Sequence, residues 1–293
     1  MYIKYLALTV LTFLAFSCGN TNLANKEFLH SEIKVMTFNV RYDNPEDSIN
    51  AWAYRKDNVA KTIKFYDADI VGTQEVLNNQ LEDLKEKLPE YKAIGVGRED
   101  GKAKGEYSAV LYKASRFNLQ DSGYFWLSET PDMPSKGWDA ACERIATWVI
   151  LKDTVDGEKI FVLNTHLDHV GQIARSEGVK LILDKIELYR QDFPIIVTGD
   201  FNSTPESSVV EKITSQQNSI RLYDTRLNSP LVYGPSWSFH DFGNLPYNQR
   251  PLYDYIFVND QFKIMKYGVL SESDGEHYLS DHCPVLVTLR VIN

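Results

Sequence analysis

Residues 195–207 read IIVTGDFNSTPES, an apolar run that leads into an acid and an amide, Asp200 and Asn202. The continuous run of β-branched residues is typical of a strand that is covered on both faces. Side chains two positions apart in an extended segment point the same way. We therefore expect Asp200 and Asn202 to share one side of the chain and Phe201 to point to the other.

The residues that follow this polar pair favour a helix. Thr204 can cap a helix and Pro205 suits the first helical position. This order places the pair at the C-terminal end of a strand, where open α/β sheets bind their ligands. An Asx turn, in which the acid and the amide bond only local backbone, fits the same residues. The stretch alone leaves both interpretations open.

Length and charge limit the class of protein. The chain has 293 residues, 43% of them hydrophobic, which suits one large domain. Its formal net charge is −9, from 31 Lys and Arg against 40 Asp and Glu. Proteins that grip long nucleic acids usually carry a basic surface. The charge balance argues against that class, although it does not exclude a local basic cleft.

The N-terminus predicts export and a lipid anchor. The apolar run over residues 5–16 is too short to span a membrane comfortably and is typical of a signal peptide. The SCGN junction at Cys18 resembles the lipobox of bacterial lipoproteins, in which the cysteine is lipidated and becomes the mature N-terminus. Phe16 departs from that pattern, and an ordinary secretory signal is the alternative.

These features predict the domain organisation. We expect a signal peptide over 1–17, a lipidated tether over 18–30 and one domain over 31–293, held as a monomer at a membrane of the bacterial cell envelope. In an oxidising compartment Cys142 and Cys283 could pair. We expect two buried thiols instead.

The rest of the chain reads as mixed α/β. Helical spacing of apolar residues follows AWAYRK, recurs from Leu77 to Leu88, and recurs from Val179 to Tyr189. Two packed sheets with helices outside is the natural arrangement for so many strands. Strand-like runs cover 33–40, 69–74, 107–112, 145–151, 160–166, 194–200, 253–258 and 284–290.

Acids, amides and imidazoles stand at or near the ends of six of these strands. A buried carboxylate is costly unless it is paired or bound to a metal. Carboxylate and amide oxygens suit Mg²⁺ or Mn²⁺, and such a set points to phosphoryl chemistry. No phosphate-binding loop of the Walker type is present, so water is the expected second substrate. The residues are Asn39, Glu75, His166, Asp200, Asn202, Asp254, Asp281 and His282.

The ordered motifs TFNVR, GTQEV, NTHLDH, GDFNSTPES, DYIFV and SDHCPV resemble those of the endonuclease/exonuclease/phosphatase superfamily, also called DNase I-like. The similarity covers roughly residues 33–290 and is greatest to the Ccr4/nocturnin-like branch and a related bacterial branch. It implies a four-layer α/β sandwich, two packed mixed sheets flanked by helices, with the site at one edge of the sheets.

The resemblance also implies roles for single residues. Glu75 and Asn39 match metal ligands, and Asp281 matches an acid beside the metal. Asp200 and Asn202 match the pair that holds and activates the attacking water. His282 matches the catalytic histidine, Asp254 the carboxylate that orients it, and His166 a histidine that contacts the phosphate or the leaving group.

Arginines are the remaining candidates for substrate binding. Arg175 follows the NTH motif at a spacing where related enzymes often place an arginine, and a solvated helix residue is the alternative. Arg55 and Arg144 could reach a second phosphate, or pair with surface acids.

Three functions compete at this point. The first is a Mg²⁺- or Mn²⁺-dependent phosphoesterase that acts on a nucleotide, a sugar phosphate or a phospholipid headgroup. The second is an extracytoplasmic nuclease acting on DNA or RNA. The third is a binding lipoprotein that kept the fold without catalysis, which would not require the full set of motif residues.

Overall fold

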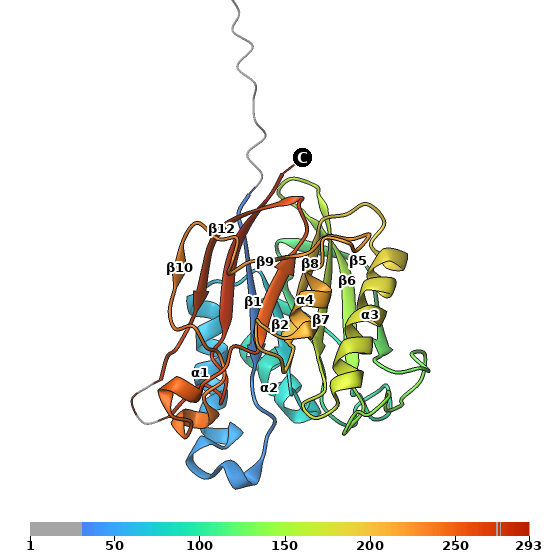
Figure 1. Ribbon diagram of the computed structural model, residues 1–293. Coiled ribbons are helices and arrows are strands. Elements are labelled where there is room, and N and C mark those ends of the chain that lie inside the picture. The colour runs from blue at the N-terminus through green and yellow to red at the C-terminus, as the bar shows by residue number, and fades with distance from the viewer. Residues whose placement is uncertain (1–30, 274, 276, 293) are drawn as a thin grey trace, which may run out of the picture.

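The computed structural model describes residues 31–273, 275 and 277–292, so the predicted signal peptide and tether, with Cys18, lie outside the described residues. The described residues form two sheets packed face to face, with helices on both outer sides (Figure 1). This confirms the expected four-layer sandwich. Within the described part of the chain, no helix combines the length and the apolar character needed to cross a membrane.

The first sheet has seven strands. Its central strands β1 and β2 are parallel, whereas β13 runs antiparallel to β1 on the other side. In spatial order the strands are β10 (Val232–Tyr233), β12 (Phe262–Val269), β13 (Val285–Val291), β1 (Ile33–Asn39), β2 (Ile70–Gln74), β4 (Val110–Lys113) and β3 (Tyr91–Ile94).

The second sheet has six strands. The pair β7 and β8 is parallel, and the other neighbours are antiparallel. In spatial order the strands are β5 (Phe117–Trp126), β6 (Ile145–Asp153), β7 (Lys159–His166), β8 (Ile195–Asp200), β11 (Asp254–Val258) and β9 (Tyr223–Asp224).

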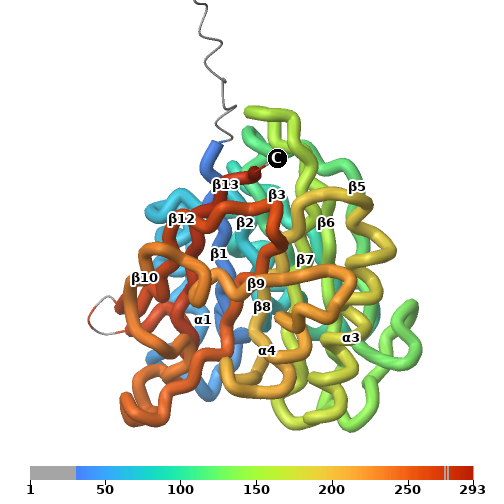
Figure 2. The backbone as a smooth tube through the Cα atoms, turned by 45° about the horizontal axis from the view of Figure 1, so that its top comes forward, coloured from blue at the N-terminus to red at the C-terminus, as the bar shows by residue number. Residues whose placement is uncertain are grey.

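Each sheet has its own pair of helices. Helices α1 (Trp52–Phe65) and α2 (Asn78–Lys87) pack their apolar faces on the first sheet. Helices α3 (Gln172–Tyr189) and α4 (Ser208–Ile213) cover the second sheet (Figure 2). Three short 3₁₀ helices lie in the connections: η1 (Pro45–Asn50), η2 (Asp241–Gly243) and η3 (Tyr247–Gln249).

The two sheets meet through an apolar core that also contains polar links. The core includes Val35 and Val287 from one sheet and Val162 and Ile196 from the other, all fully buried. Nearer the site, the amide of Asn164 joins the sheets. It donates to the backbone oxygens of Thr73 and Ala109, and its Oδ1 accepts from Gln74 Nε2 at 2.7 Å. Such bonds are strong in a dry interior, so the sheets are held in register close to the polar strand ends.

Every strand expected from the sequence is present, with bounds shifted by up to three residues, but five strands were not predicted: β3, β5, β9, β10 and β12. Strand β5 illustrates the reason, because it lies at a sheet edge and its middle residues are exposed and polar. A strand of this kind has no apolar run to reveal it.

The helix expected at Pro205 begins later. Residues 204–207 form a turn in which the Ser207 N–H donates to the Thr204 oxygen. Ser207 then caps α4, because its Oγ accepts from the Val210 N–H at 3.3 Å. The cap of this helix is therefore Ser207 and not Thr204.

Candidate active site

Strand register gathers the predicted polar residues at one edge of the sheets. Asp200 ends β8, and its Cα partners on the neighbouring strands are His166 of β7 and Asp254 of β11. In the facing sheet Asn39 ends β1, opposite Gln74, and Glu75 is the next residue. Residues that are distant in sequence thus share one site because their strands end at the same edge.

Asp200 lies at the centre of this group. Its Oδ2 is 3.0 Å from Asn39 Nδ2, 3.5 Å from His166 Nε2 and 3.6 Å from His282 Nε2. Burial, together with the negative charge of Asp254, raises the pKa of Asp200 to about 7, although His282 opposes this shift. Asp200 is therefore a carboxylate suited to accept a proton near neutral pH.

Asp200 and Asn202 satisfy both interpretations of their stretch. The Asn202 N–H donates to Asp200 Oδ1 at 2.9 Å, which is an Asx turn. Asn202 has a positive φ of 45°, so the turn rather than an extended strand aims its side chain. Both side chains nevertheless line the same pocket, and Phe201 is buried in the core on the other side.

Asp254 and His282 form the expected pair. His282 Nδ1 donates to Asp254 Oδ2 at 2.7 Å, and Ser238 Oγ donates to the same oxygen at 2.6 Å. Burial alone would lower the pKa of His282, but the charges of Asp254 and Asp200 outweigh it and raise this pKa well above its usual value. His282 is thus a buried cation whose Nε2 faces Asp200.

His166 is neutral, in contrast to the charged His282. Its Nε2 lies 3.0 Å from Asn202 Nδ2, an amide nitrogen that can only donate, and this contact favours a ring proton on Nδ1. Burial, with the nearby charges of Arg144 and Arg98, lowers the pKa of His166 well below its usual value. A neutral and a charged imidazole therefore flank Asp200. The second proton of Asn202 Nδ2 goes to the Leu167 oxygen, which leaves Asn202 Oδ1 as the free end of that amide.

The acids of the predicted metal site lie together. Asn39 Nδ2 donates at 3.0 Å to both Glu75 Oε1 and Asp200 Oδ2, while its Oδ1 accepts from the Arg41 N–H. In this orientation Asn39 ties the two carboxylates together with its nitrogen, rather than offering its oxygen to a cation. Arg41 Nη1 lies 4.0 Å from Glu75 and 3.8 Å from Asp281.

This donor set fits a hard divalent cation. Burial and the charge of Glu75 raise the pKa of Asp281 to about 6, and the pKa of Asp200 is raised as well. Ligand atoms of Glu75, Asp200 and His166 lie within 4.8 Å of one another. A cation between these groups would relieve the repulsion between the carboxylates. The carboxylate oxygens are of the type that Mg²⁺ and Mn²⁺ prefer.

A pocket of about 450 Å³ opens over these groups. Its wall includes the acids of the metal site, both histidines and several residues that we did not single out from the sequence, among them Arg41, Arg98 and Tyr253. Arg41 directly follows the TFNV segment, so its place beside a strand end could have drawn attention to it. Arg98 lies in a loop whose sequence carries no comparable signal.

Comparison with known proteins agrees with this geometry. The Endonuclease/Exonuclease/phosphatase family model matches residues 36–282, from β1 to His282. A solved endonuclease/exonuclease/phosphatase from Bacteroides vulgatus is 44% identical, with a TM-score of 0.87, over 89% of this chain and 100% of that one. The chain belongs to the endonuclease/exonuclease/phosphatase family.

Other members of the endonuclease/exonuclease/phosphatase family have described activities. A mannosyl-6-phosphatase from Bacteroides thetaiotaomicron is 38% identical, with a TM-score of 0.82, over 88% of this chain and 99% of that one. The CCR4-Not complex 3'-5'-exoribonuclease subunit Ccr4 of Saccharomyces cerevisiae is 24% identical over 80% of this chain. The match covers 35% of that protein, and 43% and 46% of two further Ccr4 proteins, so the chain spans less than half their length.

The three arginines expected to bind substrate lie in three different surroundings. Arg144 lines the pocket. Arg175 donates to the Asp168 oxygen at 2.8 Å and lies beside a separate hollow of about 360 Å³ that adjoins the pocket at Asn202 and Tyr253. The interpretation of Arg55 was wrong, because its side chain is fully buried.

Arg55 instead stabilises the fold. Its guanidinium donates to the backbone oxygens of Asn50, Val40, Leu279 and Arg41. These bonds join the chain after β1 to the loop before β13. No surface of Arg55 is left for a phosphate.

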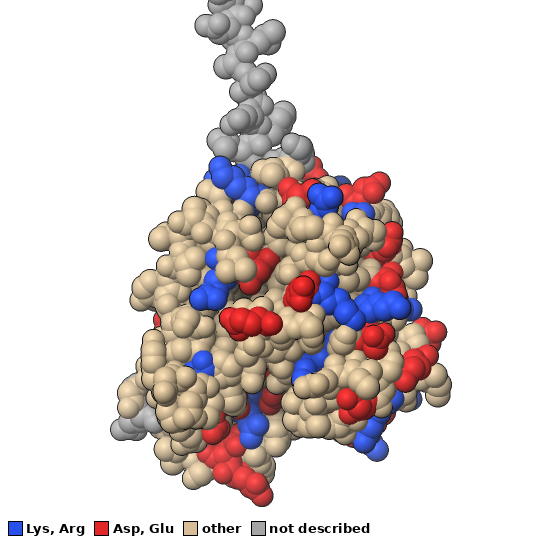
Figure 3. Space-filling model, viewed as in Figure 1, with Lys and Arg blue, Asp and Glu red and all other residues tan. Residues whose placement is uncertain are grey.

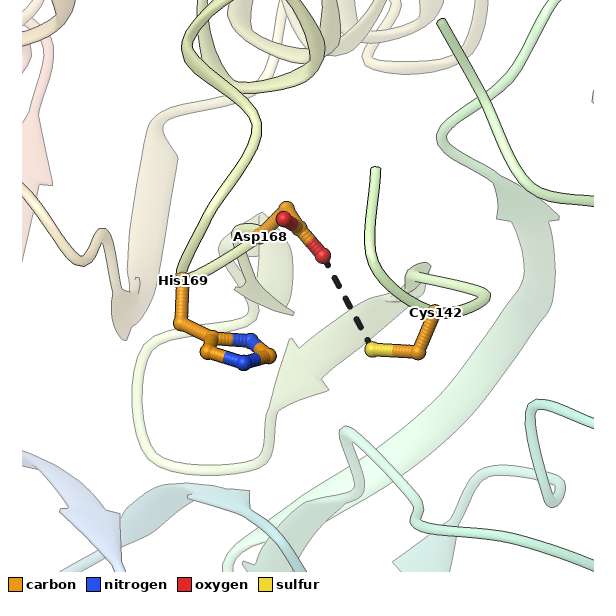
Figure 4. A group of neighbouring side chains, drawn as sticks. All are labelled: Cys142, Asp168 and His169. Atoms are coloured by element: carbon orange, nitrogen blue, oxygen red, sulfur yellow. Dashed lines mark hydrogen bonds between the residues drawn. The ribbon is translucent and has the colours of Figure 1, made fainter. Parts of the chain in front are cut away.

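Asp168 organises the rim of the pocket (Figure 4), where its side chain, Cys142 and His169 point toward one another. Its Oδ2 accepts from the Ala141 N–H and from Arg144 Nε at 3.3 Å, and Cys142 Sγ lies 3.7 Å away. Burial would raise the pKa of Asp168, but hydrogen bonds from backbone N–H groups, with the charge of Arg144, hold it well below its usual range.

This rim group is a brace for Arg144 rather than a metal centre. Burial raises the pKa of the Cys142 thiol, which keeps it protonated and a poor ligand. The arginine itself occupies the space between Asp168 and His169, since its Nη2 lies 2.9 Å from His169 Nδ1. Cys142 and Cys283 are both free, as expected, but only Cys283 is fully buried, because Cys142 reaches the pocket.

Proposed function

We propose that this protein is a phosphoesterase that depends on Mg²⁺ or Mn²⁺ and hydrolyses a small phosphoester, such as a nucleotide, a sugar phosphate or a lipid headgroup. The observation that carries the proposal is the arrangement around Asp200, with a charged His282 on one side, a neutral His166 on the other and Glu75 close by. A non-catalytic binding protein has no need of two histidines held in opposite protonation states.

The residues suit in-line attack by water on a phosphoryl group. Asp200, with a pKa near neutrality, takes the proton of the attacking water, and the free Asn202 Oδ1 orients that water. The His282 imidazolium, fixed by Asp254, stabilises negative charge that develops on the phosphoryl oxygens. A cation bound by Glu75, with Asp281 beside it, would polarise the phosphoryl group when present.

The charge balance of the chain, with a formal net charge of −9, favours a small substrate over a polymer. On the face seen in Figure 3, acidic and basic side chains are interspersed and no continuous basic track crosses the surface. A nuclease that follows a long strand needs such a track and loses affinity steeply as salt rises. The similarity to a mannosyl-6-phosphatase also favours a small substrate, while the Ccr4 relatives favour the nuclease alternative.

A phosphoester panel tests the proposal. Nucleotides, sugar phosphates, headgroup esters and single-stranded oligonucleotides are compared with Mg²⁺, with Mn²⁺ and with EDTA. We expect hydrolysis of a small ester that EDTA abolishes and that changes little between about 50 and 200 mM salt. A preference for oligonucleotides that collapses at the higher salt would replace this function with the nuclease. Full activity in EDTA would exclude the metal mechanism.

We also propose that Cys18 is the lipidated mature N-terminus and holds the protein at a membrane of the bacterial cell envelope. Support comes from the apolar run and the SCGN junction alone. Mass spectrometry of the N-terminal peptide of the mature protein tests this. A mature chain that begins elsewhere and carries a free Cys18 thiol would contradict it.

A further inference from the structure

The end of the pocket away from the acids contains a buried, incompletely bonded arginine. Arg144 is 4% exposed. Its Nε bonds Asp168 and its Nη2 bonds His169, but its Nη1 is buried and has no hydrogen-bond partner. A buried donor without an acceptor is costly, so such a donor gains from a partner such as a water, an ion or a ligand oxygen.

Two neighbouring side chains also have a buried nitrogen without a hydrogen-bond partner. Arg98 uses both Nη atoms on Glu106, at 2.6 and 2.7 Å, and its buried Nε has no partner. His166 Nδ1 is also buried without a partner. Arg98, Arg144 and His166 line one small void together. Glu106 and Asp168 each offset one arginine charge here, and Glu75 faces the void from the metal side.

The wall behind these groups is closed. The void has no room for a water molecule, and its remaining lining includes Tyr107, Ser108 and Ile145, all at most 4% exposed. An anionic oxygen therefore does not fit inside this void, and it can meet Arg144 only where this side chain lines the larger pocket. The second hollow adjoins the pocket elsewhere, at Asn202 and Tyr253.

We propose that Arg144, supported by Arg98, receives a terminal phosphoryl oxygen, so that the enzyme acts on phosphomonoesters and discriminates against phosphodiesters. This inference rests on the phosphoesterase function proposed above. A monoester presents three non-bridging oxygens, which the metal side, His282 and Arg144 can share. A diester has only two non-bridging oxygens, so one of these three partners is left without an oxygen.

The reaction balances as a simple hydrolysis. The water oxygen forms a bond to phosphorus, the bond from phosphorus to the alcohol oxygen breaks, and the water proton taken by Asp200 is returned to the alcohol. The products are inorganic phosphate and the free alcohol.

The test compares a monoester and a diester of the same leaving group, 4-nitrophenyl phosphate and bis(4-nitrophenyl) phosphate, with wild type, Arg144→Gln, Arg144→Lys and Arg221→Gln. Arg221 is an exposed arginine outside the pocket and is the matched charge-removal control. Binding of inorganic phosphate is measured by calorimetry on the same variants, and thermal unfolding shows which variants are folded.

We expect wild type to prefer the monoester. Arg144→Gln should lower kcat/KM for the monoester and the affinity for phosphate by about 10- to 100-fold, the usual size for one charge-assisted hydrogen bond, and affect the diester less. Arg144→Lys should recover part of both losses, and Arg221→Gln should match wild type.

Several results would overturn the inference. They are a wild-type preference for the diester, equal losses on both esters in Arg144→Gln, or unchanged phosphate affinity in that variant. Each of them leaves the phosphoesterase function intact, whereas hydrolysis of neither ester by wild type with any metal would remove both. If Arg144→Gln does not fold, two measurements still test the inference. They are the wild-type ratio of kcat/KM for the monoester to that for the diester, and the kinetics of Arg144→Lys.

Discussion

The two ends of the pocket are built in different ways. At the acid end, Asn39, Glu75 and Asp200 stand at the ends of β1, β2 and β8, and neighbouring strands set their positions. At the arginine end, Arg98 lies in the loop between β3 and β4, and Arg144 directly precedes β6. Asp168 and backbone N–H groups hold Arg144 in place. The polar residues beside the metal site thus come from strand ends, while the two arginines come from the connections.

The difference agrees with what each end must do. Catalytic groups need fixed separations, which hydrogen-bonded strands supply. Substrate selection varies among proteins of one fold, and loops can change without disturbing the core. Substitutions at the acid end should therefore abolish the activity, and substitutions at the rim should alter substrate preference or stability.

The largest effect is expected from the residues around the attacking water. His282→Ala and Asp200→Ala should each lower kcat by at least about 100-fold, because a charge stabiliser or a general base is lost. Steady-state kinetics on the preferred ester measures this, with Asp260→Ala, at an exposed acid, as the control. Wild-type turnover in the His282 variant would refute the proposed mechanism.

Glu75 should show a smaller effect with a different signature. Glu75→Gln should raise the Mg²⁺ concentration for half-maximal activity at least about tenfold, a loss that even the supporting partners of metal ligands can produce. Activity measured against metal concentration tests this, with the exposed Glu211→Gln as control. A metal titration identical to that of wild type would exclude Glu75 as a ligand.

The smallest effect on turnover is expected at the rim, where Asp168→Asn should mainly reduce stability. Removing one partner of a buried ion pair costs about 3–5 kcal/mol. The folded pKa of Asp168 lies below its unfolded value, so its stabilisation is present above about pH 4 and is lost as pH falls further.

Thermal unfolding of Asp168→Asn and wild type between about pH 7 and pH 3 tests this. The difference in melting temperature should be largest near neutral pH and should narrow below about pH 4. Asp132→Asn, at an exposed acid, should follow wild type throughout. A constant difference across this range would show that the negative charge of Asp168 does not stabilise the fold.

How far the sequence could predict the site depended on local signals. Asp200, Asp254 and His282 adjoin apolar strands, and polar residues in such runs stand out. The prediction for Arg55 was wrong because the sequence of an amphipathic segment does not show whether its arginine reaches solvent or backbone oxygens. Arg98 carried no signal, since its importance comes from contacts with Glu106 and from its place beside His166 and Arg144.

The amino-acid sequence was sufficient for the fold class, for most central strands and for the acid end of the site. These follow from apolar periodicity and from the polar residues that interrupt it, which are properties of short stretches. Only the tertiary structure decided the edge strands, the start of α4, the opposite protonation of His166 and His282, and the closed arginine end. Each of those depends on burial and on contacts between segments far apart in the chain, and such contacts leave no regular pattern in the sequence.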